Sequence, residues 1–161
     1  MKSKSLALSF FIATFFLSSA IPSGSHSLEI GSEAPSISLS PEAGKNIGSL
    51  DGKRVIVNFW SAEDPSSRIA NRKLSRLAES DSFSDTRFVS VCIDSDKSIA
   101  SEIARIDRIS DNVVSLGKED VTSDVLEDFQ TATGCRTFII DRFGILKQII
   151  HSGSEIPDIL S

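Results

Sequence analysis

Two cysteines, Cys92 and Cys135, are the residues of this chain with the most recognisable chemistry. A thiolate can attack a disulfide, and a second thiol is then needed to release the mixed disulfide. Cys92 lies in an apolar run, residues 88–93, where a free cysteine behaves as a small hydrophobic residue, so we expect it to be inert. Cys135 precedes Arg136, a cation that could lower the pKa of a neighbouring thiol. Alone, Cys135 could form a mixed disulfide or be oxidised, but it could not complete a dithiol cycle.

The other polar residues spell out no second catalytic arrangement. Neither His26 nor His151 lies at a sequence spacing from acidic or metal-ligating residues that would indicate a catalytic pair or a metal site. We therefore expect no metal and no cofactor. Acidic side chains after the Cys92 run, at positions 94, 96 and 102, are typical of helix caps and solvated surface. A basic stripe could receive an acidic partner, although such a stripe is more often a solvated helix face; it consists of Arg68, Arg72, Lys73 and Arg76.

The composition indicates one globular domain with an acidic surface. The 161 residues are 40% hydrophobic and 24% charged, with a formal net charge of −5. These values exclude a disordered polar chain, a coiled coil and a basic protein that binds nucleic acid. A domain of this size buries enough surface to fold without disulfides or a structural metal.

Residues 1–27 have the pattern of a secretory signal peptide. Lys2 and Lys4 precede an apolar run from Leu6 to Leu17, which is too short to span a bilayer, and small residues follow up to Ala20. Cleavage after Ala20 fits the preference for small residues, and positions 23–27 offer competing sites. We therefore expect an exported protein, in a compartment that permits disulfides, and no stable membrane span after cleavage.

Strands and helices alternate along the remaining chain, which favours a mainly parallel sheet with helices on its faces. Asp64 and Pro65 have the residue types of a helix N-cap and first helical position. A tight turn at residues 141–144 indicates a terminal β-hairpin. From apolar periodicity, the predicted strands are 53–60, 87–93, 112–116, 137–140 and 145–150, and the predicted helices are 66–77, 98–106 and 122–130.

Several short segments of the sequence, in their order and spacing, resemble segments of the exported thioredoxin-like reductases and peroxidase-like redoxins. Residues 30–39 look like the opening strand of that family, and residues 47–53 look like its approach to the first central strand. Asn58-Phe59-Trp60 matches the phrase before the redox motif, and residues 137–144 resemble the family's terminal hairpin. The resemblance implies a thioredoxin fold over residues 28–161, an α/β fold with a central mixed sheet and helices on both faces.

This chain departs from the family at its redox motif. The family usually has an aromatic residue and then Cys-x-x-Cys-Arg two residues after Asn-Phe-Trp, whereas here Asp64 stands in place of the attacking thiol and Ser67 in place of the resolving thiol. The cis-proline of the family is also missing, with Cys135 or Arg136 at its position. A cis bond without proline costs about 2.5 to 4 kcal/mol, so we expect this loop to be trans.

By the same resemblance, the Cys135 loop faces the helix N-terminus beside Asp64 and Ser67. Asp64 would raise the pKa of the Cys135 thiol and Arg136 would lower it, which leaves the sign of the net effect open. The strands at Cys92 and Cys135 are expected on opposite sides of the 53–60 strand, about 9 to 10 Å apart. Bridged cysteines need Cα atoms within about 7 Å, so an internal disulfide is not expected.

The sequence thus predicts a non-catalytic thioredoxin-like domain of the cell envelope or periplasm that binds a protein or peptide partner and no nucleic acid. The alternative is an atypical one-cysteine thiol-disulfide oxidoreductase or peroxidase-like redoxin that uses Cys135. The predicted binding residues line the former active-site groove: Trp60, Glu63, Asp64, Ser67, Cys135 and Arg136.

Overall fold

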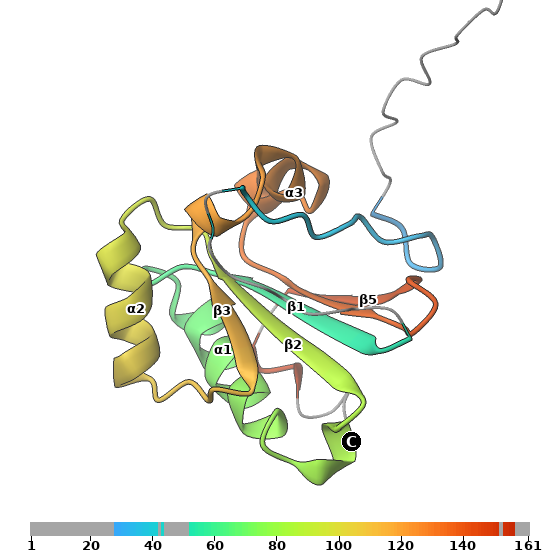
Figure 1. The fold of residues 1–161 in the computed structure, drawn as a ribbon, viewed down its shortest axis with the longest axis horizontal. Helices are drawn as coiled ribbons and strands as arrows, with labels where there is room; N and C mark the ends of the chain where they lie inside the picture. The colour runs from blue at the N-terminus through green and yellow to red at the C-terminus, as the bar shows by residue number, and fades with distance from the viewer. Residues whose placement is uncertain (1–27, 42, 44–51, 152, 157–161) are drawn as a thin grey trace, which may run out of the picture.

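Within the part of the chain that the structure describes, five strands and three α-helices form one body (Figure 1). The computed structural model describes residues 28–41, 43, 52–151 and 153–156. The strands are β1 (Arg54–Trp60), β2 (Thr86–Cys92), β3 (Val113–Leu116), β4 (Thr137–Ile140) and β5 (Leu146–Ile150). The helices are α1 (Pro65–Leu77), α2 (Lys97–Ile106) and α3 (Ser123–Asp128).

The strands make one mixed sheet in the order β3-β2-β1-β4-β5. β1 pairs in parallel with β2, and β2 pairs in parallel with β3, whereas β4 is antiparallel to both β1 and β5. The predicted α/β fold and terminal hairpin are confirmed, and the predicted element bounds agree to within about two residues. β1 is buried from Val55 to Trp60, as its nearly continuous apolar run predicts for a central strand.

Each face of the sheet packs against its own layer. On one face, α3 and the segment from Leu28 to Leu39 cover a core that includes Val57, Phe59 and Phe138. On the other face, α1 and the C-terminal segment at Ile156 cover a second core (Figure 1). β1 contributes to both, since alternate side chains of a strand point to opposite faces. α1 therefore lies directly over the carboxyl end of β1, where its first turn can form a site.

A row of polar side chains crosses the α1 face of the sheet near that end. Asn58 lies opposite Thr137 on β4 and opposite Ser90 on β2. The Thr137 hydroxyl donates to Asn58 Oδ1 at 2.9 Å, and the Ser90 hydroxyl donates to Asn71 Oδ1 of α1 at 2.6 Å. Asn58 Nδ2 donates to the same Asn71 oxygen at 3.4 Å. Since all four residues are buried, these bonds fix α1 to three strands.

The opening segment differs from the sequence-based expectation. Residues 30–39 form no strand and make two isolated bridges, Glu33 to Ile145 and Leu39 to Val121. Pro35 has no N–H to donate to a ladder, which limits continuous pairing at this place. The segment still covers the sheet, because Ala34 N–H donates to Gly144 O at 2.8 Å.

Gly153 is the point of closest approach between the C-terminal segment and α1. A Cβ at this position would lie 2.5 Å from Ser66 O and 2.7 Å from Ala70 N. The Gly153 carbonyl also accepts from Lys73 Nζ at 2.9 Å. Glycine is therefore required here by the contact with the helix backbone.

The predicted signal peptide, residues 1–27, lies outside the described residues, as does most of the 47–53 phrase. Among the residues that the structure describes, no helix is long and apolar enough to cross a membrane.

Candidate functional site

The N-terminus of α1 carries the predicted site, and Asp64 begins it. Asp64 is the N-cap, in extended conformation, and its Oδ1 accepts from Ser66 N–H at 3.0 Å. Pro65 occupies the first helical position, where its missing N–H leaves no bond unmade. The predicted cap is confirmed. The position where the resemblance implies an attacking thiol thus holds a carboxylate that accepts hydrogen bonds and stabilises the helix start.

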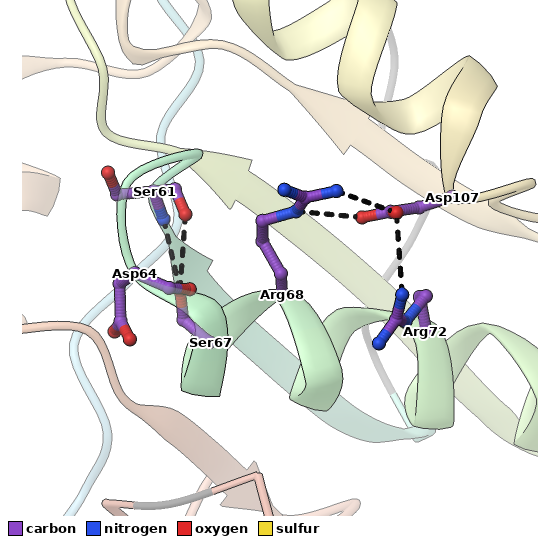
Figure 2. Close-up of polar contacts among 6 residues, drawn as sticks. All are labelled: Ser61, Asp64, Ser67, Arg68, Arg72 and Asp107. Atoms are coloured by element: carbon purple, nitrogen blue, oxygen red, sulfur yellow. Dashed lines mark hydrogen bonds and ion pairs between the residues drawn. The ribbon is translucent and has the colours of Figure 1, made fainter.

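The Ser67 side chain makes hydrogen bonds that hold the first turn of α1 to the preceding loop. Its hydroxyl donates to Asp64 O at 2.9 Å and accepts from Ser61 N–H at 3.2 Å (Figure 2). The side chain is buried, with only 6% of the residue exposed. Where the resemblance implies a resolving thiol, the Ser67 hydroxyl therefore keeps the turn hydrogen-bonded, but a hydroxyl cannot take part in disulfide exchange.

Asp94, just beyond β2, holds the loop between β1 and α1. Its two carboxylate oxygens accept from the Ser61 hydroxyl at 2.6 Å and from Ala62 N–H at 2.7 Å. Burial raises the pKa of the Asp94 carboxyl, but the bonds from Ala62, Ser61 and Cys92 outweigh burial, so this pKa lies below its usual value. Asp94 is thus an ionised acceptor that positions the loop beneath the site.

Cys135 reaches the same helix end from the loop before β4, as the resemblance implied. Burial raises the pKa of its thiol above the ordinary value, the neighbouring Ser67 hydroxyl opposes the shift, and the Asp64 carboxylate adds to it. The net direction, open in the sequence, is therefore upward. A thiol with a raised pKa is less ionised at neutral pH and a poorer nucleophile than an ordinary surface cysteine.

Arg136 does not assist Cys135. Its Nη2 donates to Gln130 O at 2.9 Å and to Thr133 Oγ1 at 2.6 Å, and its guanidinium lies 5.7 Å from the centre of the Phe138 ring. The Arg136 side chain therefore stabilises the loop before β4, which carries it. All described peptide bonds are trans, as expected for a loop without proline.

The two thiols lie on opposite sides of β1. Cys92 is the register partner of Trp60 across the β1–β2 pair, whereas Arg136 O accepts from Phe59 N–H on the β4 side. Both cysteines are free. Burial raises the pKa of Cys92 to about 12, so this thiol stays protonated at neutral pH. The expected placement of the two strands is confirmed.

The six predicted groove residues do not all share one surface. Asp64, Ser67, Cys135 and Arg136 gather at the α1 N-terminus, and Glu63 is exposed beside them. Trp60 is buried, with 3% exposed, and lines a separate hollow of about 100 Å³ under α2. Strand alternation turns Trp60 to the same face as Asn58, but on that face Trp60 lies toward α2 and Asn58 lines the cavity beside Cys135.

The cavity beside Cys135 is small. It has a volume of about 10 Å³, between Ser67, Thr137 and His151 among others, which is room for about one water molecule. Pockets for small-molecule ligands have volumes of about 300 Å³ or more. Among the described residues, this cavity is therefore smaller than a typical small-molecule pocket, and the surface around it is shallow.

Sequence reasoning missed the polar row beneath the site. Asn71 joins α1 to Asn58 and Ser90, and Ser61 joins the loop to Asp94. The available signal was Asn58, a polar residue within an otherwise apolar central run. No group of three or more potential metal ligands occurs among the described residues.

Together, this topology and the helix end next to the loop before β4 define a thioredoxin-like fold. A thioredoxin-like protein from Parabacteroides distasonis is similar, with 24% identity over 83% of this chain and 95% of that one, at a TM-score of 0.63. A thiol:disulfide interchange protein from Bacteroides sp. also has 24% identity, over 83% and 88%, at 0.65. A secreted disulfide oxidoreductase from Mycobacterium tuberculosis has 15% identity, over 69% and 82%, at 0.56. No family model and no curated protein matches the chain.

Proposed function

We propose that this protein is a non-catalytic thioredoxin-like domain of the cell envelope that binds a protein or peptide partner at the α1 N-terminus. One observation carries the proposal. Where the resemblance places two redox thiols, this chain has the Asp64 carboxylate and the Ser67 hydroxyl, and both make hydrogen bonds within the start of α1. The scaffold of a thiol-disulfide interchange site is kept while its nucleophile is replaced. The fold itself does not assign the role, because function depends on the site.

The surface around this end supports a macromolecular partner. Glu63 is exposed and Cys135 is half-buried, while the cavity between Cys135 and β5 is water-sized. An extended peptide can use such a shallow surface, whereas a small metabolite needs a deeper pocket. Export is part of the proposal, supported by the pattern of residues 1–27 and by the similar fold of a secreted disulfide oxidoreductase.

The second candidate function is a one-cysteine redox enzyme. The Ser67 hydroxyl next to Cys135 favours it, because this hydroxyl acts to lower the pKa of the thiol. Burial and the Asp64 carboxylate act in the opposite direction and prevail. The binding function is therefore the better supported of the two.

Binding of an unfolded, fully alkylated polypeptide tests the proposal, because such a probe has no thiol to exchange. We expect measurable binding in fluorescence anisotropy, unchanged by Cys135→Ser. Glu63→Lys should alter the affinity by about fivefold, since it reverses an exposed charge at the binding surface. The matched control is Glu79→Lys, an exposed glutamate just beyond the other end of α1, which should have no effect. Equal effects of the two reversals, or loss of binding in Cys135→Ser, would contradict the proposal.

A further inference from the structure

The outer face of α1 is basic although the protein is acidic. α1 carries no acidic residue, and its basic residues are Arg68, Arg72, Lys73 and Arg76. The whole chain has a formal net charge of −5. A basic surface attracts acidic partners, whereas the same basic face on a second copy of the chain is repelled by it.

Only part of this positive charge is compensated within the fold. Asp107, at the C-cap of α2, accepts from Arg68 Nε at 3.1 Å and from Arg68 Nη2 at 2.8 Å (Figure 2). Arg72 Nη1 lies 3.6 Å from the same carboxylate, and the Arg72 side chain is 44% exposed. Arg76 is exposed, and no ion pair of this residue occurs within the described ranges. One carboxylate therefore serves two arginines, and Arg76 adds a further charge.

Exposed apolar side chains lie next to these arginines. Ile69 is 40% exposed and stands between Arg68 and Arg72 on α1. Ile106 is 54% exposed and directly precedes Asp107, the carboxylate that pairs with Arg68. Neither isoleucine belongs to the two buried cores.

A hollow in this face has the size of one side chain. It measures about 170 Å³ and is lined by Pro65, Arg68, Ile69 and Arg72. Because this hollow is open to solvent, it can hold part of one leucine or phenylalanine side chain while the rest of that side chain stays exposed. The combination of an apolar hollow with flanking arginines suits one kind of ligand.

We infer that the α1 outer face, defined by Pro65, Ile69, Arg72, Arg76 and Ile106, docks an acidic peptide segment with an apolar anchor. The anchor side chain enters the hollow at Ile69, and carboxylates on either side of it meet Arg72 and Arg76. Arginine suits such contacts, because its planar fork binds carboxylates in pairs of hydrogen bonds. This surface shares Pro65 with the N-terminal end of the helix, but its charged residues Arg72 and Arg76 lie outside the surface of the proposed function.

A synthetic peptide with leucines at helical spacing and glutamates around them is the probe. Two control peptides replace the glutamates by lysines or the leucines by serines. We expect the purified protein to bind the glutamate–leucine peptide, more weakly as salt is added, and to bind each control peptide at least about tenfold more weakly. Equal binding of all three peptides would overturn the inference.

Charge reversal locates the binding. Arg72→Glu with Arg76→Glu should weaken binding by about tenfold or more, because two attractions become repulsions. Arg76→Glu alone, which disturbs no bond of the described fold, should give a smaller loss in the same direction. The control is Arg142→Glu, an exposed arginine in the β4–β5 turn at the other end of the sheet, which should leave the affinity unchanged.

Two results would assign the surface differently. If Glu63→Lys changes the affinity for this peptide while the arginine reversals do not, the peptide binds at the surface of the proposed function and the inference is wrong. If the protein self-associates and Ile106→Ser abolishes the association, the occupant is a second copy of the chain and the inference is likewise overturned.

Discussion

Replacement of Asp94 by asparagine tests whether this carboxylate positions the loop before α1. The folded protein gives Asp94 two short bonds, 2.6 Å from the Ser61 hydroxyl and 2.7 Å from Ala62 N–H. Asparagine keeps one acceptor oxygen and places an amide NH₂ against the other donor. One hydrogen bond to a charged group is then lost, which costs about 1.5 to 3 kcal/mol.

Thermal unfolding followed by circular dichroism measures this loss. For a domain of this size each kcal/mol shifts the midpoint by roughly 4 °C, so Asp94→Asn should unfold about 6 to 12 °C below the parent at pH 7. The matched control is Asp111→Asn, an exposed aspartate before β3, which should shift stability by less than about 0.5 kcal/mol.

The pH dependence gives a second test of the same bonds. The pKa of Asp94 is lower in the folded state than in the unfolded state. Its contribution to stability is therefore complete above the unfolded pKa of about 3.9 and is lost as the pH falls through the folded-state pKa. The difference between parent and variant should shrink in acid. A variant as stable as the parent at pH 7, or a difference that persists in strong acid, would refute the reasoning.

Three further predictions concern the packing and chemistry of the site. Gly153→Ala should destabilise the protein by about 1 to 3 kcal/mol in urea unfolding, because its Cβ would meet Ser66 O at 2.5 Å; an unchanged midpoint would mean that the C-terminal segment does not pack there. Asn71→Leu should destabilise it by about 1 to 3 kcal/mol in the same assay, because two buried donors lose their acceptor, and wild-type stability would disprove that bonding. Cys135 should react with iodoacetamide at pH 7 more slowly than a free cysteine, because the pKa of its thiol is raised. Asp64→Asn should speed this reaction, since asparagine caps a helix equally well but removes the negative charge beside the thiol. A parent rate above that of free cysteine would contradict this account.

A double-cysteine variant tests whether the start of α1 has the geometry that disulfide exchange requires. Asp64→Cys with Ser67→Cys places two thiols at the start of α1, where a helix N-terminus stabilises a thiolate. We expect this double variant to form an internal disulfide and to reduce insulin disulfides above the parent rate. Free thiols that stay unpaired under mild oxidation would show that the helix start no longer has the geometry of a redox site.

Much of the fold could be predicted from local sequence, because periodicity and turn residues act over short distances. The continuous apolar run of β1 marks a central strand, and Asp64 with Pro65 marks the start of α1. The opening segment was the exception, since its two bridges depend on partners more than 80 residues away along the chain. The phrase around residues 30–39 fits a strand only by resemblance.

The site was predictable in its location but less so in its details. Asp94 and Ser61 are 33 residues apart, and only the folded sheet brings them together. The direction of the Cys135 pKa shift depends on the burial of the thiol and on the orientation of Arg136 toward Gln130. The local sequence determines neither of these features. Trp60 was placed in the groove by its neighbours in sequence, whereas strand alternation turns it beneath α2.

The central claim is that this thioredoxin-like protein has no disulfide-exchange activity of its own. Its most direct test is the rate at which the purified protein reduces a small disulfide and forms mixed disulfides with it, measured beside Cys135→Ser. We predict that both proteins stay at the background rate, because Asp64 and Ser67 cannot exchange disulfides and the Cys135 thiol is poorly ionised. A parent that is clearly active, together with an inactive Cys135→Ser, would contradict the claim and identify a one-cysteine redox enzyme.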